Sequence, residues 1–246
     1  MNEDLALKLK YLRLGGLLAH WDDYLRLAAE QRFSHAHLLT HVLEEEYRLK
    51  QENARQFRRQ CARLPEPWVL ETFPFDQQPK LNRKRIMALY DSPSYLQNHQ
   101  NILWLGGTGC GKTGLATSFL IHAMDQGYRA RYVLFADLLA QFYRSAADHS
   151  EAKLLKHYGA WDCLLIDELG YVEVEPAQVG LFFTLMHQRH KKKTTLITSN
   201  LGFSEWGSFL KNDHLTAALI DRLTENSHVI NMKGCVSLRP KMNPEP

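Results

Sequence analysis

One glycine-rich stretch constrains this chain more than any other. Residues 101–116 are Asn-Ile-Leu-Trp-Leu-Gly-Gly-Thr-Gly-Cys-Gly-Lys-Thr-Gly-Leu-Ala, so an apolar run stops at a loop and a helical pattern follows. The loop fits G-x-x-x-x-G-K-[ST], with Gly106 and Gly111 as its fixed glycines. Glycines let successive backbone N–H groups curl around phosphate oxygens, and the helix that starts at Lys112 points its positive end at the same anion. The stretch therefore predicts a strand, a phosphate-binding loop and a helix.

The motif also predicts individual roles for a bound nucleoside triphosphate, expected to be ATP with Mg²⁺. Lys112 is expected to reach the β- and γ-phosphates, and the Thr113 hydroxyl is expected to bind Mg²⁺. A glycine-rich turn with a stray lysine is the plain alternative, but the strand before the loop and the helix after it supply the required context. The residues expected around the phosphates are Gly106, Gly107, Thr108, Gly109, Cys110, Gly111, Lys112 and Thr113.

Composition narrows the class of protein only a little. The 246 residues are 45% hydrophobic and 23% charged, which is typical of a globular protein. A net charge of +3 is compatible with nucleic acid but is not evidence for it. No apolar stretch approaches a membrane span, the N-terminus lacks the pattern of a signal peptide, and the four cysteines form no C-x-x-C pair. These features favour a cytoplasmic protein.

Strands and helices alternate after the loop. Strands are expected at residues 130–135, 163–168, 194–200 and 228–232, and helices at 112–126, 137–145, 151–158, 176–190 and 215–223. This alternation predicts an α/β fold with a parallel sheet flanked by helices and with its chemistry at the carboxyl ends of the strands.

The N-terminal part has a different pattern. Leucines recur at helical spacing up to about Arg63, and Ser34 is a plausible N-cap for a long helix. Prolines 65 and 67 stop that helix, and residues 65–79 look irregular. We therefore expect a helical domain at 1–64, a linker at 65–79 and a nucleotide-binding domain at 80–246.

Two acids close the strand that begins at Cys163. Buried apolar residues precede Asp167 and Glu168, which emerge where a magnesium–nucleotide complex would lie. Asp167 suits the Mg²⁺ shell, and Glu168 suits orienting and deprotonating the water that attacks the γ-phosphate. Alone, such a pair is often a solvated turn. One strand after a phosphate loop, it indicates hydrolysis.

Two further polar residues have possible roles. Asn200 closes the next strand, where its amide can hold the attacking water or sense the γ-phosphate, although asparagine is also common in turns. Arg222 lies on a later helix and could stabilise the transferring phosphoryl group of a neighbouring subunit. A surface ion pair with Asp221 or Glu225 is the alternative.

These motifs together resemble the IstB family, ATP-binding helper proteins of insertion-sequence transposition that are related to the DnaC helicase loaders of the AAA+ superfamily. The resemblance rests on the phosphate loop, on Leu-Leu-Ile-Asp-Glu-Leu-Gly-Tyr at 164–171, on Thr-Ser-Asn-Leu-Gly-Phe-Ser-Glu-Trp at 198–206 and on Ala-Leu-Ile-Asp-Arg-Leu at 218–223. Leu-Arg-Leu-Gly-Gly-Leu at 12–17 and Phe-Pro-Phe-Asp at 73–76 extend it over nearly the whole chain.

The resemblance implies a small all-α N-terminal domain that binds DNA or partners, followed by an AAA+ ATPase domain that forms a homo-oligomer on duplex DNA when ATP is bound. The family captures and prepares target DNA and stimulates a cognate transposase. By motif position, Asp167 and Glu168 form the hydrolytic pair, Asn200 is the first sensor and Arg222 acts in trans.

The C-terminal stretch departs from the family pattern. Residues 234–239 are Gly-Cys-Val-Ser-Leu-Arg, where the family usually has Gly-x-Ser-Tyr-Arg. The chain stops soon after Arg239, so we expect no full C-terminal lid and a greater dependence on a neighbouring subunit.

Several basic groups are candidates for DNA contacts. The helix before Pro65 carries Arg55, Arg58 and Arg59, which form either a phosphate-contacting stripe or a solvated helix face. The resemblance adds Arg144, Lys153 and Lys156, because the two helices between the second and third strands occupy the place of a DNA-facing unit. Lys191–Lys193 is expected to be a solvated turn at the opposite end of the sheet from the nucleotide. A further cluster at residues 80–85 could contact DNA, a subunit or only water.

Three functions remain open from the sequence. The first is an ATP-dependent DNA remodeller that assists transposition. The second is a replicative helicase loader of the same clade, and the third is a nucleotide-switched DNA scaffold with marginal hydrolysis. A small-molecule kinase with a phosphate loop is disfavoured, because no acceptor-substrate motif accompanies Asn200 and Arg222.

Overall fold

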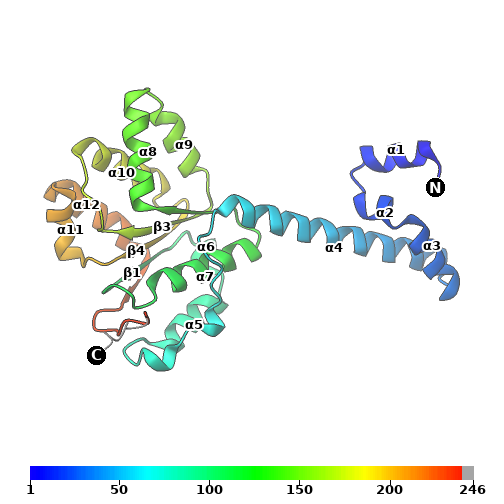
Figure 1. Ribbon diagram of the computed structural model, residues 1–246, viewed down its shortest axis with the longest axis horizontal. Helices are drawn as coiled ribbons and strands as arrows, with labels where there is room; N and C mark the ends of the chain where they lie inside the picture. The colour runs from blue at the N-terminus through cyan, green and yellow to red at the C-terminus, as the bar shows by residue number, and fades with distance from the viewer. Residues whose placement is uncertain (240–246) are drawn as a thin grey trace, which may run out of the picture. The chain divides into compact units, whose positions relative to one another are not determined.

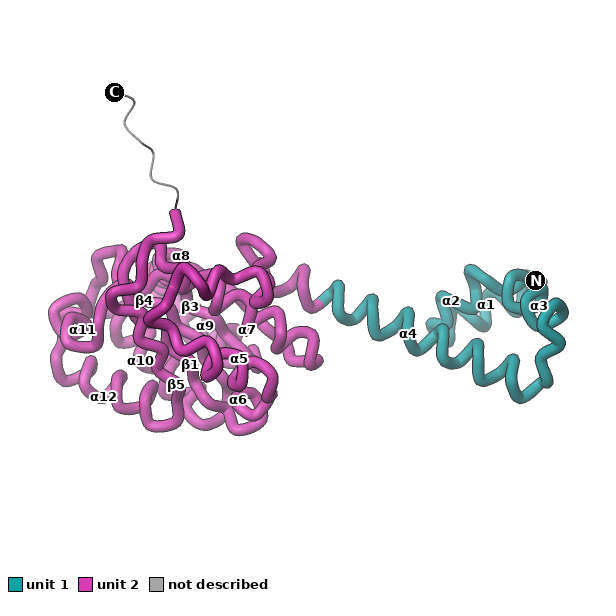
Figure 2. Tube along the Cα trace, turned by 90° about the horizontal axis from the view of Figure 1, so that it is seen from below, with its two compact units in different colours: residues 1–57 teal, residues 58–246 magenta. Residues whose placement is uncertain are grey.

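The structure is a computed structural model that describes residues 1–239. The chain forms two compact units that divide between Phe57 and Arg58 (Figure 2). The division falls within one helix, α4 (His35–Ala62). The domain boundaries expected after residues 64 and 79 stay predictions, and the two units are described separately below.

The first unit is all helical. It contains α1 (Glu3–Tyr11), α2 (Gly15–Ala19), α3 (Trp21–Glu30) and most of α4 (Figure 1). The backbone N–H of His37 donates to the Ser34 hydroxyl over 3.2 Å, so Ser34 caps α4 as expected. Within the unit, the buried carboxylate of Glu46 accepts a hydrogen bond from the Leu17 backbone N–H over 3.0 Å and so ties α4 to α2.

Residues 65–79 pack as part of the second unit. After α4 ends at Ala62, the chain makes two short 3₁₀ helices, η1 (Leu70–Thr72) and η2 (Phe75–Gln77). The prolines of residues 65–79 favour an irregular backbone, but the side chains of Leu70, Phe73 and Phe75 are buried in the core beside α7 (Lys112–Asp125). The apolar side chains of this segment therefore anchor it to the nucleotide-binding unit.

A five-stranded parallel sheet forms the centre of the second unit. Its strands are β1 (Asn101–Leu105), β2 (Ala130–Leu134), β3 (Cys163–Leu169), β4 (Thr194–Ser199) and β5 (Ser227–Asn231), in the order β2-β3-β4-β1-β5. This confirms the expected parallel α/β fold. The observed strand ends lie within two residues of those predicted.

Helices cover both faces of the sheet (Figure 1). Because side chains alternate along a strand, Ile102 and Trp104 of β1 enter one core while Leu103 and Leu105 enter the other. The first core packs against α5 (Arg83–Asp91), α6 (Ser94–Gln97) and α7. The second packs against α8 (Phe135–Ala147), α9 (Glu151–Gly159), α10 (Pro176–Arg189), α11 (Phe203–Leu210) and α12 (Asp213–Thr224).

The helix α11 was not predicted from the sequence. Gly202 precedes it and Gly207 interrupts it, so its propensity is weak. Burial of Trp206 and Leu210 in the second core stabilises it instead. The sequence analysis assigned no helix between residues 200 and 215 and therefore missed α11.

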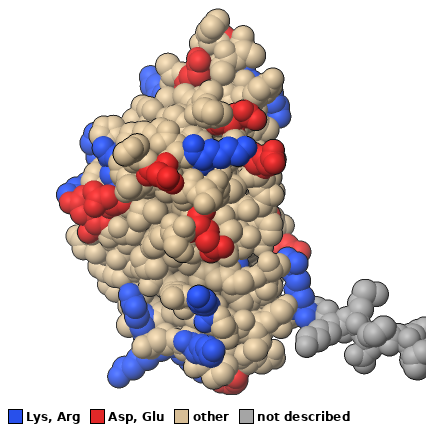
Figure 3. Space-filling view, turned by 90° about the vertical axis from the view of Figure 1, so that its left-hand side faces the viewer, with Lys and Arg blue, Asp and Glu red and all other residues tan. Residues whose placement is uncertain are grey.

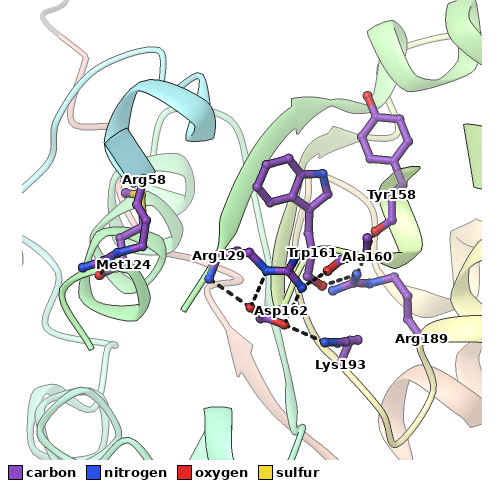
Figure 4. Close-up of polar contacts among 9 residues, drawn as sticks. All are labelled: Arg58, Met124, Arg129, Tyr158, Ala160, Trp161, Asp162, Arg189 and Lys193. Carbon is purple, nitrogen blue, oxygen red and sulfur yellow. Dashed lines mark hydrogen bonds and ion pairs between the residues drawn. The ribbon is translucent and has the colours of Figure 1, made fainter. Parts of the chain in front are cut away.

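A polar network closes the amino end of the sheet (Figure 4). Lys193 Nζ donates to Asp162 Oδ1 over 2.6 Å, and Arg129 Nε donates to Asp162 Oδ2 over 3.2 Å. The guanidinium of the fully buried Arg189 donates to the carbonyls of Tyr158, Trp161 and Thr194. The turn at Lys191–Lys193 thus lies before β4, opposite the carboxyl ends of the strands, as expected.

Among residues 1–239, no helix is both long and apolar enough to cross a bilayer. The expected lack of a full C-terminal lid concerns residues after Arg239, which lie outside the described part of the chain.

Candidate nucleotide-binding site

The glycine-rich loop has the geometry that its sequence predicts. It leaves β1 at Leu105 and enters α7 at Lys112. Gly109 and Gly111 have φ angles of 78° and 91°, in the left-handed region that favours glycine. A Cβ atom on Gly109 would lie 2.4 Å from the Ser237 hydroxyl, and one on Gly111 would lie 2.6 Å from the Phe73 ring. Both positions therefore require glycine.

A cavity of about 520 Å³ opens beside this loop, within the range of small-molecule sites. It is lined by the predicted phosphate-binding and acidic residues together with residues from β2 and β4 and from the segments 65–68 and 238–239. Its lining comprises Pro65, Glu66, Trp68, Gly109, Gly111, Lys112, Thr113, Gly114, Tyr132, Asp167, Glu168, Tyr171, Thr198, Leu238 and Arg239.

Lys112 is the first residue of α7, and it is only 8% exposed because its side chain reaches back into the loop. Its ammonium group donates to the carbonyls of Gly106 and Gly107 over 2.8 and 2.7 Å. Burial lowers the pKa of Lys112, although nearby groups that include Asp167 and Glu168 act to raise it. A phosphate would give this partly desolvated cation a stronger, charged acceptor.

Three hydroxyl groups hold the buried carboxylate of Asp167. Thr113 Oγ1 donates to it over 3.0 Å to Oδ1 and 3.1 Å to Oδ2, so the two expected magnesium ligands are adjacent. Tyr132 donates to Oδ2 over 3.0 Å, and Thr198 donates to Oδ1. Burial, and then the negative charge of Asp167, raises the pKa of the Tyr132 hydroxyl. These oxygens are the ligand type that Mg²⁺ prefers.

Sequence reasoning missed Tyr132 and Thr198 as members of the site. Tyr132 lies on β2, and the parallel pairing of β2 with β3 brings it beside Asp167. No motif marks such a tyrosine. Thr198 had a weak signal, because it lies two residues before Asn200 at the end of β4.

Glu168 is presented to solvent by an irregularity of β3. Its φ is 62°, and the pairing of β3 with β4 shifts register between Ile166 and Leu169. The Glu168 N–H donates to Thr198 Oγ1 over 2.9 Å. Left-handed backbone is costly for a residue other than glycine and is typical of functional sites. The bulge turns the carboxylate from the buried core to the cavity.

Asn200 lies in a neighbouring cavity of about 340 Å³ together with Gly106, Gly107, Glu205 and Lys233. Its buried Oδ1 makes no hydrogen bond to any atom of the described residues. The structure thus brings Asn200 to the start of the phosphate loop, in a cavity that Asp167 and Glu168 do not line.

Arg222 lies outside both cavities. Its guanidinium stacks over the Phe183 ring with 4.7 Å to the centroid, and Nη1 donates to the Ala218 carbonyl over 3.2 Å. The alternative of an ion pair is not found among the described residues, because Glu225 pairs with His190 and Lys191 instead.

The basic residues proposed for DNA contact fall into two groups. Arg58 Nε donates to the Met124 carbonyl over 3.0 Å (Figure 4), and Arg59 pairs with Asp125 over 3.4 Å. Both therefore hold the end of α4 against the end of α7, while Arg55 belongs to the first unit. The second group is exposed on α8 and α9 without an ion pair to any described residue, and comprises Arg144, Lys153 and Lys156.

Basic side chains also gather at the level of α5 on one face of the protein, whereas acidic and basic side chains mix above them (Figure 3). The sequence cluster at residues 80–85 begins this helix. Arg83, Lys84 and Arg85 occupy its first turn, where the helix dipole disfavours positive charge.

Comparisons with known proteins find relatives along nearly the whole chain. The IstB-like ATP binding protein family matches residues 7–245. The putative ATP-binding protein of insertion sequence IS5376 from Geobacillus stearothermophilus is 31% identical over 223 residues, which cover 91% of this chain and 88% of that protein. The putative ATP-binding protein of IS21 from Pseudomonas aeruginosa is 29% identical and covers 94% and 87%, respectively.

Solved structures resemble the fold of the second unit. DnaI is 16% identical with a TM-score of 0.57 and covers 67% of this chain and 90% of that chain. AMPPCP-bound DnaA from Aquifex aeolicus is 18% identical with a TM-score of 0.57 and covers 69% and 51%. These likenesses show that this chain shares the arrangement of sheet and helices of those proteins.

Proposed function

Because the chain belongs to the IstB-like ATP binding protein family, we propose that it is an ATPase that assembles on duplex DNA and assists transposition. It would capture or remodel target DNA and stimulate a cognate transposase. The observation that carries the proposal is the meeting of Lys112, Thr113, Asp167 and Glu168 in one cavity. Relatives named as ATP-binding proteins of insertion sequences support the link to transposition.

The chemistry follows from the groups around the cavity. The loop N–H groups and Lys112 bind the phosphates, and Glu168 accepts the proton of the attacking water. Thr113 and Asp167 would hold Mg²⁺, which when bound neutralises charge on the phosphates. Tyr132 and Thr198 orient the Asp167 carboxylate toward Thr113.

Assembly would complete the site. Arg222 stacks on Phe183 outside the nucleotide cavity of its own chain, so a neighbouring subunit is the natural recipient of its charge. Asn200 would sense the γ-phosphate from the side of Gly106. The exposed basic residues of α8 and α9 are the best candidates for DNA, since no acidic side chain among the described residues pairs with them.

The proposal is tested with Glu168→Gln, with Glu173→Gln in the nearby exposed loop as a matched control. Glu168→Gln should bind ATP with unchanged Kd and should hydrolyse it at least about 100-fold more slowly, because the general base is lost. Glu173→Gln should behave like the wild type. Isothermal calorimetry and phosphate release give the two readouts.

The same variant separates the rival functions. If Glu168→Gln assembles on DNA and supports full transposition, hydrolysis is dispensable and the protein is a nucleotide-switched scaffold. If the wild type captures a purified replicative helicase and not its transposase, the helicase-loader function replaces the one proposed.

A further inference from the structure

The nucleotide cavity is lined by two aromatic side chains that the proposed chemistry does not use, Trp68 and Tyr171, and the indole of Trp68 is the larger. Trp68 lies in the segment that follows α4 and lines the same cavity as Lys112 and Asp167. It is 39% exposed, whereas Trp104 and Trp206 are fully buried in the two cores. A ligand in this cavity can therefore reach part of the Trp68 ring.

The ring of Trp68 rests on the first turn of α7. A Cβ atom built on Gly114 would lie 3.0 Å from two atoms of the indole ring. Gly114 immediately follows Thr113, so the indole lies against helix backbone next to the phosphate-binding groups. The helix supports the ring, and the missing side chain at Gly114 permits this close approach.

The cavity is chemically divided. Lys112, Thr113, Asp167 and Glu168 supply its charged and polar part, which matches a triphosphate. The lining also includes Pro65, Trp68 and Leu238, which offer apolar and aromatic surface beside the charged Glu66 and Arg239. A ligand that carries a flat aromatic ring at one end and phosphates at the other fits both parts.

We propose that the Trp68 indole is a stacking platform for the adenine base of ATP. The inference rests on the proposed function only in taking ATP as the ligand, and it adds the residue that holds the base. Stacking on an aromatic ring tolerates any purine because every base has a π-face. Trp68 should therefore strengthen binding of ATP and GTP alike and leave binding of the phosphates unaffected.

Three ligands test this role on the full-length protein: ATP, GTP and inorganic tripolyphosphate, which has no base. Trp68→Ala should weaken ATP and GTP about tenfold to hundredfold, since base stacking is typically of that strength. The Kd of tripolyphosphate should not change. Trp68→Phe should retain most of the affinity for ATP. The neighbouring Val69→Ala, which lies outside the cavity lining and is also exposed, is the control.

Intrinsic fluorescence gives a second readout. ATP should quench the emission of the wild type, and Trp68→Phe should remove the quench while calorimetry still detects binding. If Trp68→Ala weakens tripolyphosphate as much as ATP, the ring only supports the loop and the proposal is overturned. If Trp68→Ala binds ATP as tightly as the wild type does, the stacking role of Trp68 is overturned and the proposed function is not. If the wild type binds neither ATP nor tripolyphosphate, the proposed function is overturned as well.

Discussion

At the scale of single residues, the geometry of the site converges on Asp167. The sequence predicted its role and that of Thr113, because the two motifs are local patterns on one strand and one loop. It did not predict Tyr132 and Thr198, because their contacts with Asp167 depend on strand pairing between distant segments. The position of Arg222 over Phe183 likewise arises from the packing of α12 on α10.

Removing the Tyr132 hydroxyl tests whether it positions Asp167. Tyr132→Phe should raise the Mg²⁺ concentration needed for half-maximal ATP hydrolysis about tenfold, because groups that orient metal ligands typically contribute this much to metal affinity. The affinity of Tyr132→Phe for ATP without Mg²⁺ should be unchanged. The control Tyr143→Phe, at an exposed tyrosine, should have the affinities of the wild type. A merely structural role would predict a lower unfolding temperature with an unchanged Mg²⁺ titration.

The charge of Asp162 makes the free energy of unfolding depend on pH. Burial raises the pKa of Asp162, but hydrogen bonds from Arg129 and Lys193 outweigh it and hold the pKa at about 2, below the ordinary value of 3.8. Because the pKa is lowered in the folded state, this carboxylate stabilises the protein above pH 3.8, and the effect disappears as the pH falls to about 2.

Asp162→Asn should therefore unfold at a lower temperature than the wild type at neutral pH, with a difference that shrinks between pH 3.8 and about 2. Thermal melts across this range measure the difference. Asp148→Asn, whose carboxylate accepts hydrogen bonds from nearby Ser150, is the control. A difference between Asp162→Asn and the wild type that stays constant with pH would contradict the prediction.

At the scale of elements, the sequence predicted the five strands of residues 1–239, most of which are largely apolar and bounded by polar or turn residues. It missed α11, where glycines weaken the helical pattern and tertiary burial of Trp206 supplies the stability. The linker expected at residues 65–79 stays a prediction, but the prolines on which it rests do not reveal that Leu70 and Phe73 enter the core. Propensity describes local backbone, and these segments are determined by distant packing.

The pair α8 and α9 carries the prediction for DNA. Lys153→Gln combined with Lys156→Gln should weaken duplex binding and reduce the slope of log K against log salt by about 2, because each lysine that neutralises a phosphate contributes about 1 to that slope. The control removes the same charge elsewhere with Lys192→Gln and Lys211→Gln. Fluorescence anisotropy at several salt concentrations gives both slopes, and an equal weakening in the two double variants would show a non-specific charge effect.

At the scale of the whole molecule, Arg222 lies apart from the nucleotide cavity of its own chain. Among the described residues, Arg222 contacts Phe183 and Ala218 and lines neither cavity. The sequence offered a role in trans for this arginine from its place on a late helix, with a surface ion pair as the alternative, and the family resemblance favoured the role in trans. We therefore expect any contact of Arg222 with a nucleotide to involve a second copy of the chain.

Mixing two inactive variants tests that arrangement. Arg222→Ala keeps its own cavity intact, and Glu168→Gln keeps its arginine. An equal mixture assembled on DNA with ATP should regain ATPase activity at about one interface in four, by random pairing in a cyclic assembly. Mixing Glu168→Gln with Lys112→Ala, which both damage the cavity, is the control. Recovery no greater than in this control would contradict an arginine supplied by a neighbour.

The left-handed backbone of Glu168 has a consequence for how this protein can evolve. At a φ of 62°, glycine is conformationally easier than glutamate, so Glu168→Gly relieves local strain while it removes the general base. Selection of a mutant library for folding alone should therefore enrich glycine or asparagine at this position. Selection for ATP turnover should restore glutamate. The residue found at position 168 therefore indicates whether selection maintains ATP hydrolysis.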